Sequence, residues 1–447
     1  MKPYRKFSVG SLAILTILTF CVFDLIAGRS VWADSRREAA LNPLPSAIPD
    51  RIVLTWRDNP VTSQAVTWRT DSTVKQAFAE IAPADPSPDF TKKAQRFQAK
   101  TTSMKTKSGR AVYHSVNFEN LHPNMLYAYR VGSRESWSEW FHFRTASDQP
   151  GPFSFIYFGD AQNNVLSLWS RAIRSAYSDA PKARFMIHAG DLVDHANRDR
   201  EWGEWFQAGG WIHSMVPSIP IPGNHEYARD ENGVYRLSHY WRPQFTLPEH
   251  GVEGLEETVY YIDYQGVRII GLNSNERLEE QAVWLDKALQ NNSIRWTVVT
   301  FHHPVFSSAK GRDNKRLREL WKPILDKYRV DIVLQGHDHT YARGRNLSLG
   351  VSVQDPKSGT VYVVSISGPK MYKLTPNRWM DRAAENTQLF QVISVTQDTL
   401  HYQAITVTGE LYDAFDLIKQ EGAANLLVER ISSEEPERTF KSTSGKR

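Results

Sequence analysis

The chain has 447 residues, of which 41% are hydrophobic and 12% aromatic, so it encodes a packed globular protein and not a disordered one. This length exceeds what one ordinary hydrophobic core covers, which favours two domains. Of the formal net charge of +5, a net +3 lies in residues 1–33, and no dense Lys/Arg run indicates nucleic acid as a main partner. The single cysteine, Cys21, lies in the same segment, which excludes disulfides and cysteine ligands from the rest of the chain.

The first 33 residues have the features of a secretory signal peptide. A basic start (Lys2, Arg5 and Lys6) precedes an apolar stretch over residues 12–26 and a cleavage site after Ala33. The apolar stretch is shorter than the roughly 20 residues that a membrane-spanning helix needs. We therefore expect an exported protein that is periplasmic, secreted or at the cell surface, with no stable membrane span after cleavage. An uncleaved membrane anchor is the alternative.

Residues 34–48 are polar and contain proline, which indicates a linker. Residues 49–146 then consist of short runs in which apolar and polar residues alternate, as in half-buried strands. The runs cover residues 52–56, 64–68, 112–118, 126–131 and 140–144. They predict an antiparallel β-sandwich, and Trp68 and the stretch from Leu121 to Tyr129 are similar to a fibronectin type III module. We expect a structural or positioning role for this domain, since we find in it no constellation of polar groups that could do chemistry.

Proline and glycine at residues 148–152 mark a domain boundary, and helical patterns alternate with strand-like runs from residue 152 to residue 415. The predicted helices cover residues 165–177, 201–212, 276–289 and 314–328, and the predicted closing strands cover 361–367, 389–395 and 399–407. This alternation predicts an α/β domain with its site at the carboxyl ends of strands. Residues 416–447 are charged and rich in Ser and Thr, which predicts a mobile tail.

Five apolar runs of the second domain end abruptly in residues that can bind a metal ion. They end, in chain order, at Asp160, at Asp191 with Asp194, at Asn224 with His225, at His302, and at His337 with His339. Oxygen ligands combined with imidazoles suit first-row divalent ions, or Fe(III) beside one of them. One carboxylate can bridge two ions, and such pairs recur in enzymes that cleave phosphate esters. The sequence therefore predicts a metal site.

This series of motifs resembles the calcineurin-like metallophosphoesterase superfamily and, with the fibronectin-like module, is most similar to the purple acid phosphatase group. The resemblance covers roughly residues 50–410, and five motifs in the right order make it specific although each is weak alone. It implies an all-β N-terminal sandwich followed by an α/β metallophosphoesterase domain, in which a β-sandwich is flanked by helices. It also implies an acid-phosphatase-like hydrolase that acts on a phosphorylated small molecule and uses two metal ions, from among Fe, Zn and Mn.

The resemblance assigns a role to each motif residue. It implies six metal ligands: Asp160 and His339 on the first ion, Asn224, His302 and His337 on the second, and Asp191 bridging both. The implied catalytic residues are His225, which protonates the leaving group or holds the phosphate, together with Asp191 and Asn224. A metal-bound hydroxide would attack phosphorus in line, without a phosphoenzyme. Tyr341 and Arg343 are expected to support the site.

Two positions depart from the family's pattern. The tyrosine that gives purple acid phosphatases their colour is replaced by Asp194, so the protein should not be purple and a fixed Fe(III) is less favoured. Position 162 is Gln, where many relatives without that tyrosine have a histidine ligand. Gln162 could bind weakly through its carbonyl or have no direct role. The first metal is therefore expected to bind less tightly than the second.

Two alternatives remain open from the sequence. A phosphodiesterase or nucleotide pyrophosphatase would use the same ligands, and loops such as residues 229–257 would decide between these activities. A surface binding protein that has lost activity is the alternative outside enzymes. The sequence indicates neither the physiological substrate nor the oligomeric state.

Overall fold

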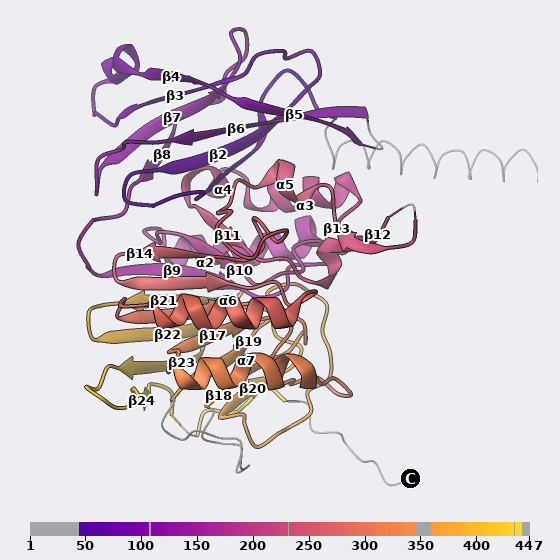
Figure 1. Cartoon of the computed structure of the whole chain (residues 1–447), viewed down its shortest axis with the longest axis vertical. Coiled ribbons are helices and arrows are strands. Elements are labelled where there is room, and N and C mark those ends of the chain that lie inside the picture. Colours follow the sequence, from indigo (N-terminus) through magenta and orange to yellow (C-terminus); the bar gives the residue numbers. More distant parts are fainter. Residues whose placement is uncertain (1–43, 107–108, 231, 346–358, 433, 440–447) are drawn as a thin grey trace, which may run out of the picture. The chain divides into compact units, whose positions relative to one another are not determined.

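The computed structural model describes residues 44–106, 109–230, 232–345, 359–432 and 434–439 (Figure 1). The expected signal peptide and most of the expected linker lie outside these ranges. Within the described ranges, no helix is both long and apolar enough to cross a membrane.

The N-terminal domain consists of two four-stranded antiparallel sheets that enclose one core. One sheet has the order β1-β2-β6-β5 (Asp50–Thr55, Gln64–Asp71, Gly109–Phe118 and Lys100–Thr106), and the other has the order β4-β3-β7-β8 (Gln95–Gln98, Phe78–Pro83, Leu126–Gly132 and Phe141–Arg144). Trp68 from the first sheet and Tyr129 from the second are fully buried in the shared core. All five predicted strands are present. The prediction missed β3, β4 and β5, and the last two are mostly exposed strands with little apolar alternation.

The second domain contains two seven-stranded sheets. The first has the order β11-β10-β9-β21-β22-β23-β24 (Ser218–Pro220, Met186–His188, Phe153–Phe158, Leu389–Val395, Thr399–Thr406, Leu411–Ile418 and Leu426–Glu429). The second has the order β14-β15-β16-β17-β19-β18-β20 (Tyr260–Tyr264, Val267–Gly271, Trp296–Thr300, Ile332–Gln335, Val361–Val364, Tyr341–Arg345 and Arg382–Ala384). Strands β9, β10 and β11 are parallel, as are β15, β16, β17 and β19. Parallel strands covered on both faces favour the nearly continuous apolar runs seen in the sequence.

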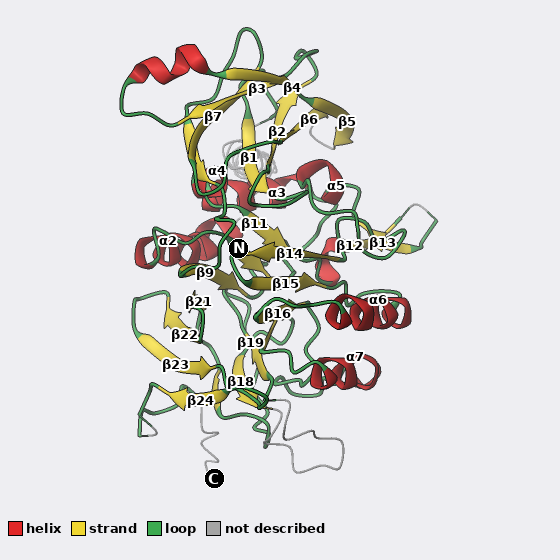
Figure 2. Ribbon diagram, turned by 60° about the vertical axis from the view of Figure 1, so that its left-hand side comes forward, coloured by secondary structure: helices red, strands yellow, loops and turns green. Residues whose placement is uncertain are grey.

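Successive residues of the central strands face two different cores, because side chains alternate between the faces of a sheet. Val298 of β16 and Ile156 of β9 belong to one buried core, which joins the two sheets into a sandwich. Val299, the neighbour of Val298, belongs to a second core together with Leu285 and Trp321 of helices α6 and α7 on the outer face. Helices α6 (Leu278–Gln290) and α7 (Lys315–Lys327) lie side by side (Figure 2). The predicted β-sandwich flanked by helices is confirmed.

The remaining helices are shorter. They are α2 (Ser170–Asp179), which follows a π-helical turn at Val165–Trp169, α3 (Asp199–Gly209), α4 (Ile212–Met215) and α5 (Trp241–Gln244). A small hairpin of β12 (Tyr227–Arg229) and β13 (Tyr235–Leu237) stands apart from the large sheets. A further single turn of 3-10 helix covers Asn224–Glu226.

A buried ion network joins the N-terminal sandwich to the second domain. Both terminal nitrogens of Arg51 donate to the carboxylate of Asp199, at 2.8 and 3.1 Å, at the start of α3. Arg69 approaches the same carboxylate at 3.3 Å. Such buried charges must be paired to be tolerated, so the two domains depend on each other for this charge balance.

The expectation of a mobile tail from residue 416 is wrong for residues up to Glu429. Strand β24 pairs with β23, and the carboxylate of Glu429 accepts two hydrogen bonds from the buried Arg343, both at 2.8 Å. The guanidinium of Arg430 also binds the carboxylate of Asp416. The prediction failed because this edge strand is held by charged pairs and backbone bonds, while its few apolar residues resemble those of a disordered segment.

Candidate metal centre

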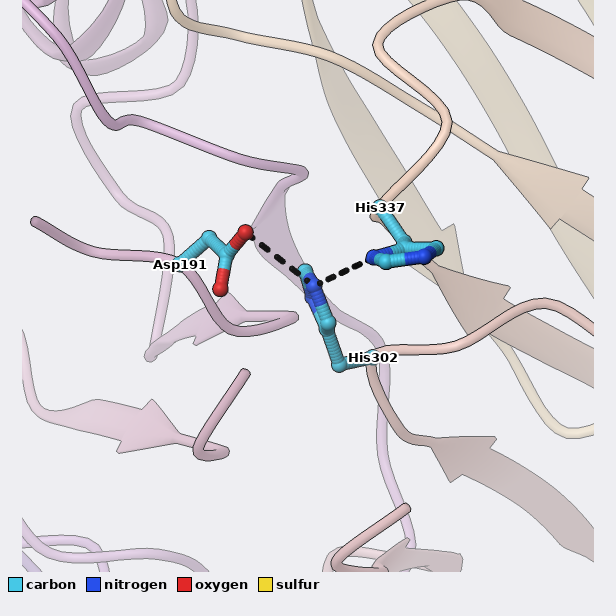
Figure 3. Close-up of side chains that lie close together, drawn as sticks. All are labelled: Asp191, His302 and His337. Atoms are coloured by element: carbon cyan, nitrogen blue, oxygen red, sulfur yellow. Dashed lines mark hydrogen bonds and ion pairs between the residues drawn. The ribbon is translucent and has the colours of Figure 1, made fainter. Parts of the chain in front are cut away.

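The five predicted ligand motifs all lie just beyond the carboxyl ends of parallel strands. Asp160 follows β9, Asp191 follows β10 and Asn224 follows β11, all in the first sheet. His302 follows β16 and His337 follows β17 in the second sheet. Because parallel strands present their carboxyl ends at one edge, the two sheets bring these side chains together. Figure 3 shows Asp191, His302 and His337, which converge from three separate loops.

One group of ligand atoms forms around His302. Its Nε2 atom lies 3.2 Å from Oδ2 of Asp191, 3.2 Å from Oδ1 of Asn224 and 3.2 Å from Nδ1 of His337. Asp191, His302 and His337 offer ligand atoms that all lie within 4.8 Å of one another. The four side chains predicted for the second metal are thus in contact.

A second group shares Asp191 with the first. Asp160, Asp191 and His339 likewise offer ligand atoms within 4.8 Å of one another, and Nε2 of His339 lies 3.2 Å from Oδ2 of Asp160. The side chains of Asp160 and Asp191 are at most 1% exposed. One carboxylate common to two groups is the arrangement expected of a bridging ligand.

The electrostatics of this second group fit a cation. Oδ2 of Asp160 is buried and has no hydrogen-bond partner among the described residues, a costly condition that a bound ion would relieve. Burial raises the pKa of Asp160 to about 7 although the charge of His302 opposes the shift, and the nearby Asp191 carboxylate adds to it. Burial lowers the pKa of His339 to about 3, so its ring is neutral at neutral pH and offers a lone pair. The residues therefore fit the metal ions that the motifs predicted.

The loops hold unusual backbone conformations at the ligands themselves. Asp191, His337 and His339 have φ angles of 51°, 75° and 50°, in the left-handed region that non-glycine residues seldom adopt. Gly190 has a φ of 87°, and a Cβ atom there would lie 2.7 Å from Nδ1 of His302. A Cβ atom on Gly336 would lie 2.2 Å from Oδ1 of Asp160. The site therefore needs glycine beside its ligands for close approach.

Backbone carbonyls orient the two imidazoles whose Nε2 atoms face the carboxylates. Nδ1 of His302 donates to the carbonyl oxygen of Ala189 at 2.9 Å, and Nδ1 of His339 donates to that of Lys370 at 2.9 Å. These bonds select the tautomer that leaves Nε2 free to bind a metal.

Glu226 organises the Asp191 loop, a role that the sequence analysis missed. Its fully buried carboxylate accepts hydrogen bonds from the backbone N–H groups of Asp191, Leu192, Val193 and Gly223, at 2.8, 2.9, 3.4 and 2.7 Å. An acidic residue directly after Asn224 and His225 was the available signal. Only the folded chain reveals that it faces the backbone instead of the metal site.

His225 lies at the rim of the centre, and 26% of its side chain is exposed. Its backbone N–H donates to Oδ1 of Asp191 at 2.8 Å. Ring atom Nδ1 donates to the carbonyl oxygen of Asp194 at 2.6 Å and lies 3.4 Å from Oδ1 of the same residue. Nε2 lies 3.9 Å from Oδ2 of Asp191, on the side of the metal ligands. Asp194 thus contacts His225, where a tyrosine would have bound the metal.

Tyr341 and Arg343, the expected supporting residues, bond to a carboxylate outside the ligand set, while the His303 ring lies beside a ligand ring. Tyr341 and Arg343 are buried and bond to the carboxylate of Asp413, so they tie β18 to β23. His303 bonds to the hydroxyl of Ser274 at 2.8 Å, and its ring centre lies 4.2 Å from that of His337.

The rim also carries residues that sequence reasoning did not identify. Arg312 donates to the carbonyl oxygen of His337 at 2.7 Å, and its guanidinium lies 4.7 Å from the ring centre of Tyr372. The Tyr372 ring in turn lies 4.5 Å from that of His339. Tyr235, on the β12–β13 hairpin, is 49% exposed and donates to the carbonyl oxygen of Asn224 at 2.5 Å.

Two known family models match the two domains in their order along the chain. Residues 49–145 match the family model of the purple acid phosphatase N-terminal domain, and residues 154–341 match that of calcineurin-like phosphoesterase. An uncharacterized protein of Mycobacterium tuberculosis is 26% identical over 339 residues, which is 67% of this chain and 63% of that protein. Purple acid phosphatase 15 of Arabidopsis thaliana is 26% identical over 297 residues, which is 59% of this chain and 54% of that protein.

A solved structure extends the comparison of the fold. A purple acid phosphatase from yellow lupin (Lupinus luteus) seeds matches with a TM-score of 0.71 and 20% identity, covering 85% of this chain and 75% of that one. The chain itself spans less than two thirds of the length of the two curated relatives. Both family models match in the order of the two domains described above, and the chain belongs to the calcineurin-like phosphoesterases, with an N-terminal domain of the purple acid phosphatase type.

Proposed function

We propose that this protein is an exported, metal-dependent phosphoesterase, most similar in action to an acid phosphatase that cleaves phosphate monoesters. The observation that supports it best is the pair of ligand groups that share Asp191, with His225 beside them. Two divalent ions held there would neutralise the phosphate and lower the pKa of bound water until a nucleophile forms near neutral pH.

The chain's own residues would position the reacting groups. We assign the first ion to Asp160 and His339, the second to Asn224, His302 and His337, and both ions to Asp191. Nδ1 of His225 donates to the Asp194 carbonyl, so Nε2 of the same ring faces the metal ligand Asp191. That atom can therefore bind a phosphate oxygen or deliver a proton to the leaving alcohol.

The charge at the rim favours a monoester. Arg312 keeps 30% of its side chain exposed beside His337, where it can pair with a phosphate oxygen that no metal neutralises. A monoester carries more negative charge than a diester, so it gains more from this cation. The half-exposed ring of Tyr235 favours the alternative of a nucleotide diester or pyrophosphate, because such a ring can stack on a base.

The test is hydrolysis of matched aryl phosphate mono- and diesters by metal-stripped protein resupplied with Mn, Zn or Fe. We expect faster monoester turnover that depends on the added ion, and no turnover by an Asp191→Asn variant. Faster diester turnover would move the assignment to phosphodiesterase. A folded wild-type sample that hydrolyses neither ester with any ion would overturn the proposal and favour a binding protein.

Export is a separate part of the proposal. It is supported by the basic start and apolar stretch of residues 1–33. N-terminal sequencing of protein from fractionated cells should find a mature chain that begins at Asp34 outside the cytoplasm. An intact start at Met1 in the cytoplasmic fraction would contradict it.

A further inference from the structure

The side chain of Lys370 contacts the metal centre through one intermediary, Gln162. Its ammonium lies 3.0 Å from Oε1 of Gln162. Nε2 of the same amide lies 2.6 Å from Oδ2 of Asp191 and 3.2 Å from Nε2 of His339. Gln162 is completely buried, so its amide has to satisfy its hydrogen bonds within the protein.

The chemistry of lysine decides which way this amide points. An ammonium group has donors and no acceptor, so the amide atom that faces it is the oxygen. The two N–H groups then face Asp191 and His339, which are acceptors. An amide has a single oxygen, so the Gln162 oxygen that Lys370 holds is not offered to a metal ion beside Asp191.

The loop that carries Lys370 is hydrogen-bonded to the loops of His339 and Asp160, and these bonds hold the contact with Gln162 in place. The backbone carbonyl of Lys370 accepts the bond from Nδ1 of His339, and the N–H of Gly368 donates to the carbonyl oxygen of Asp160 at 2.6 Å. A Cβ atom on Gly368 would lie 2.5 Å from the carbonyl oxygen of Ala161, so the two loops approach as closely as backbones can.

We propose that Lys370 makes the first metal subsite the weaker and exchangeable one, by holding the Gln162 oxygen away from it and placing a positive charge behind it. The inference rests on the two-metal centre proposed above. Three side chains remain for the first ion: Asp160, Asp191 and His339. The second ion has four: Asp191, Asn224, His302 and His337. The buried, unpartnered Oδ2 of Asp160 still attracts a cation, so the first subsite is weakened and not abolished.

The test measures metal binding and not activity. Mn²⁺ is titrated calorimetrically into chelator-stripped protein, and the ions retained after dialysis are counted by mass spectrometry. Wild-type protein should show two classes of site whose dissociation constants differ at least tenfold, with one ion retained. Lys370→Met should tighten the weaker class by about 10-fold to 100-fold, the range that outer-shell contacts of metal sites typically control. Lys373→Met, which changes an exposed lysine three residues away, should leave both classes unchanged.

A Gln162→Ala variant separates the two effects of Lys370. This variant should bind metal at the weaker class of site with nearly the affinity of wild-type protein, because the Gln162 amide oxygen is not a metal ligand in wild-type protein. In the Gln162→Ala background, Lys370→Met should lose most of its tightening effect.

Two results would overturn the inference: equal affinity of both ions in wild-type protein, or unchanged metal affinity in Lys370→Met. A Lys370→Met variant with reduced turnover and unaltered metal binding would instead assign Lys370 to the substrate. If the two classes of site appear but no phosphate ester is cleaved, the proposed function fails while this inference stands.

Discussion

The two halves of the metal centre are built from the same kind of strand-end loop, yet their surroundings differ. Around the second subsite, Nε2 of His302 directly contacts Asp191, Asn224 and His337, and the Ala189 carbonyl fixes the His302 ring. Around the first, the Gln162 amide contacts Asp191 and His339, and the Lys370 ammonium contacts the oxygen of that amide. We infer from this difference that Lys370, which offers no ligand atom to the site, affects how firmly the first ion is held.

The largest effect is expected where the two halves share a ligand. Asp191→Asn should abolish binding of both ions and reduce hydrolysis to the background of metal-free protein, because one carboxylate serves both groups. Asp160→Asn should remove only the first ion and leave about one ion per chain. The number of metal ions bound per chain, measured on folded samples of each variant, tests both expectations. Loss of both ions from the Asp160 variant would show that the halves are not separable.

His225→Asn should come next, because this residue lies at the rim and is not a ligand. We expect kcat for alkyl phosphates to fall by about 10²–10⁴-fold, the usual contribution of a general acid, with metal content unchanged. The loss should be smaller for p-nitrophenyl phosphate, whose leaving group needs little protonation. Equal losses for both substrates would instead assign His225 to phosphate binding.

Glu226→Gln should weaken both halves together. A glutamine has only one acceptor oxygen for the four backbone N–H groups that Glu226 now satisfies, and its amide nitrogen would face donors. Metal affinity should fall by roughly 10-fold to 100-fold. Glu249→Gln, at an exposed position, is the matched control. Loss of one ion alone would mean that the Asp191 loop supports only one subsite.

The change with the smallest expected effect on the metal centre concerns stability. His213 stacks on Trp205 with ring centres 4.1 Å apart, and burial lowers its pKa from 6.5 to about 3. The unfolded chain gains a proton below pH 6.5 while the folded chain does not, so this residue lowers stability as pH falls from 6.5 to 3, by about 1.4 kcal/mol per pH unit.

The measurement is denaturant unfolding of metal-free protein at several pH values. His213→Phe should keep the aromatic packing and reduce the acid-side loss of stability, while above pH 6.5 the slopes of both proteins should agree. An identical pH dependence throughout would mean that His213 is already protonated in the folded protein.

Much of the site could be read from local pattern. An apolar run followed at once by Asp, Asn or His encodes both a buried strand and the residue at its end, so Asp160, Asp191 and His302 were identifiable as members of an ordered series, although each motif is weak alone. The longer helices were also predictable, because the patterns over 276–289 and 314–328 closely match α6 and α7. Edge strands such as β24 were missed, because an edge position weakens the apolar signal on which such predictions depend.

The order of the domains, the kinds of ligand and the two departures at Gln162 and Asp194 could all be identified from the amino-acid sequence. The contacts of those two residues depend on the folded chain. The contact between Lys370 and Gln162 joins residues 208 positions apart, and Asp194 is turned toward His225, 31 positions away. The type of a residue can be read at its own position in the sequence. Its contact partner depends on how the sheets bring distant loops together, and the periodicity of apolar residues does not indicate that partner.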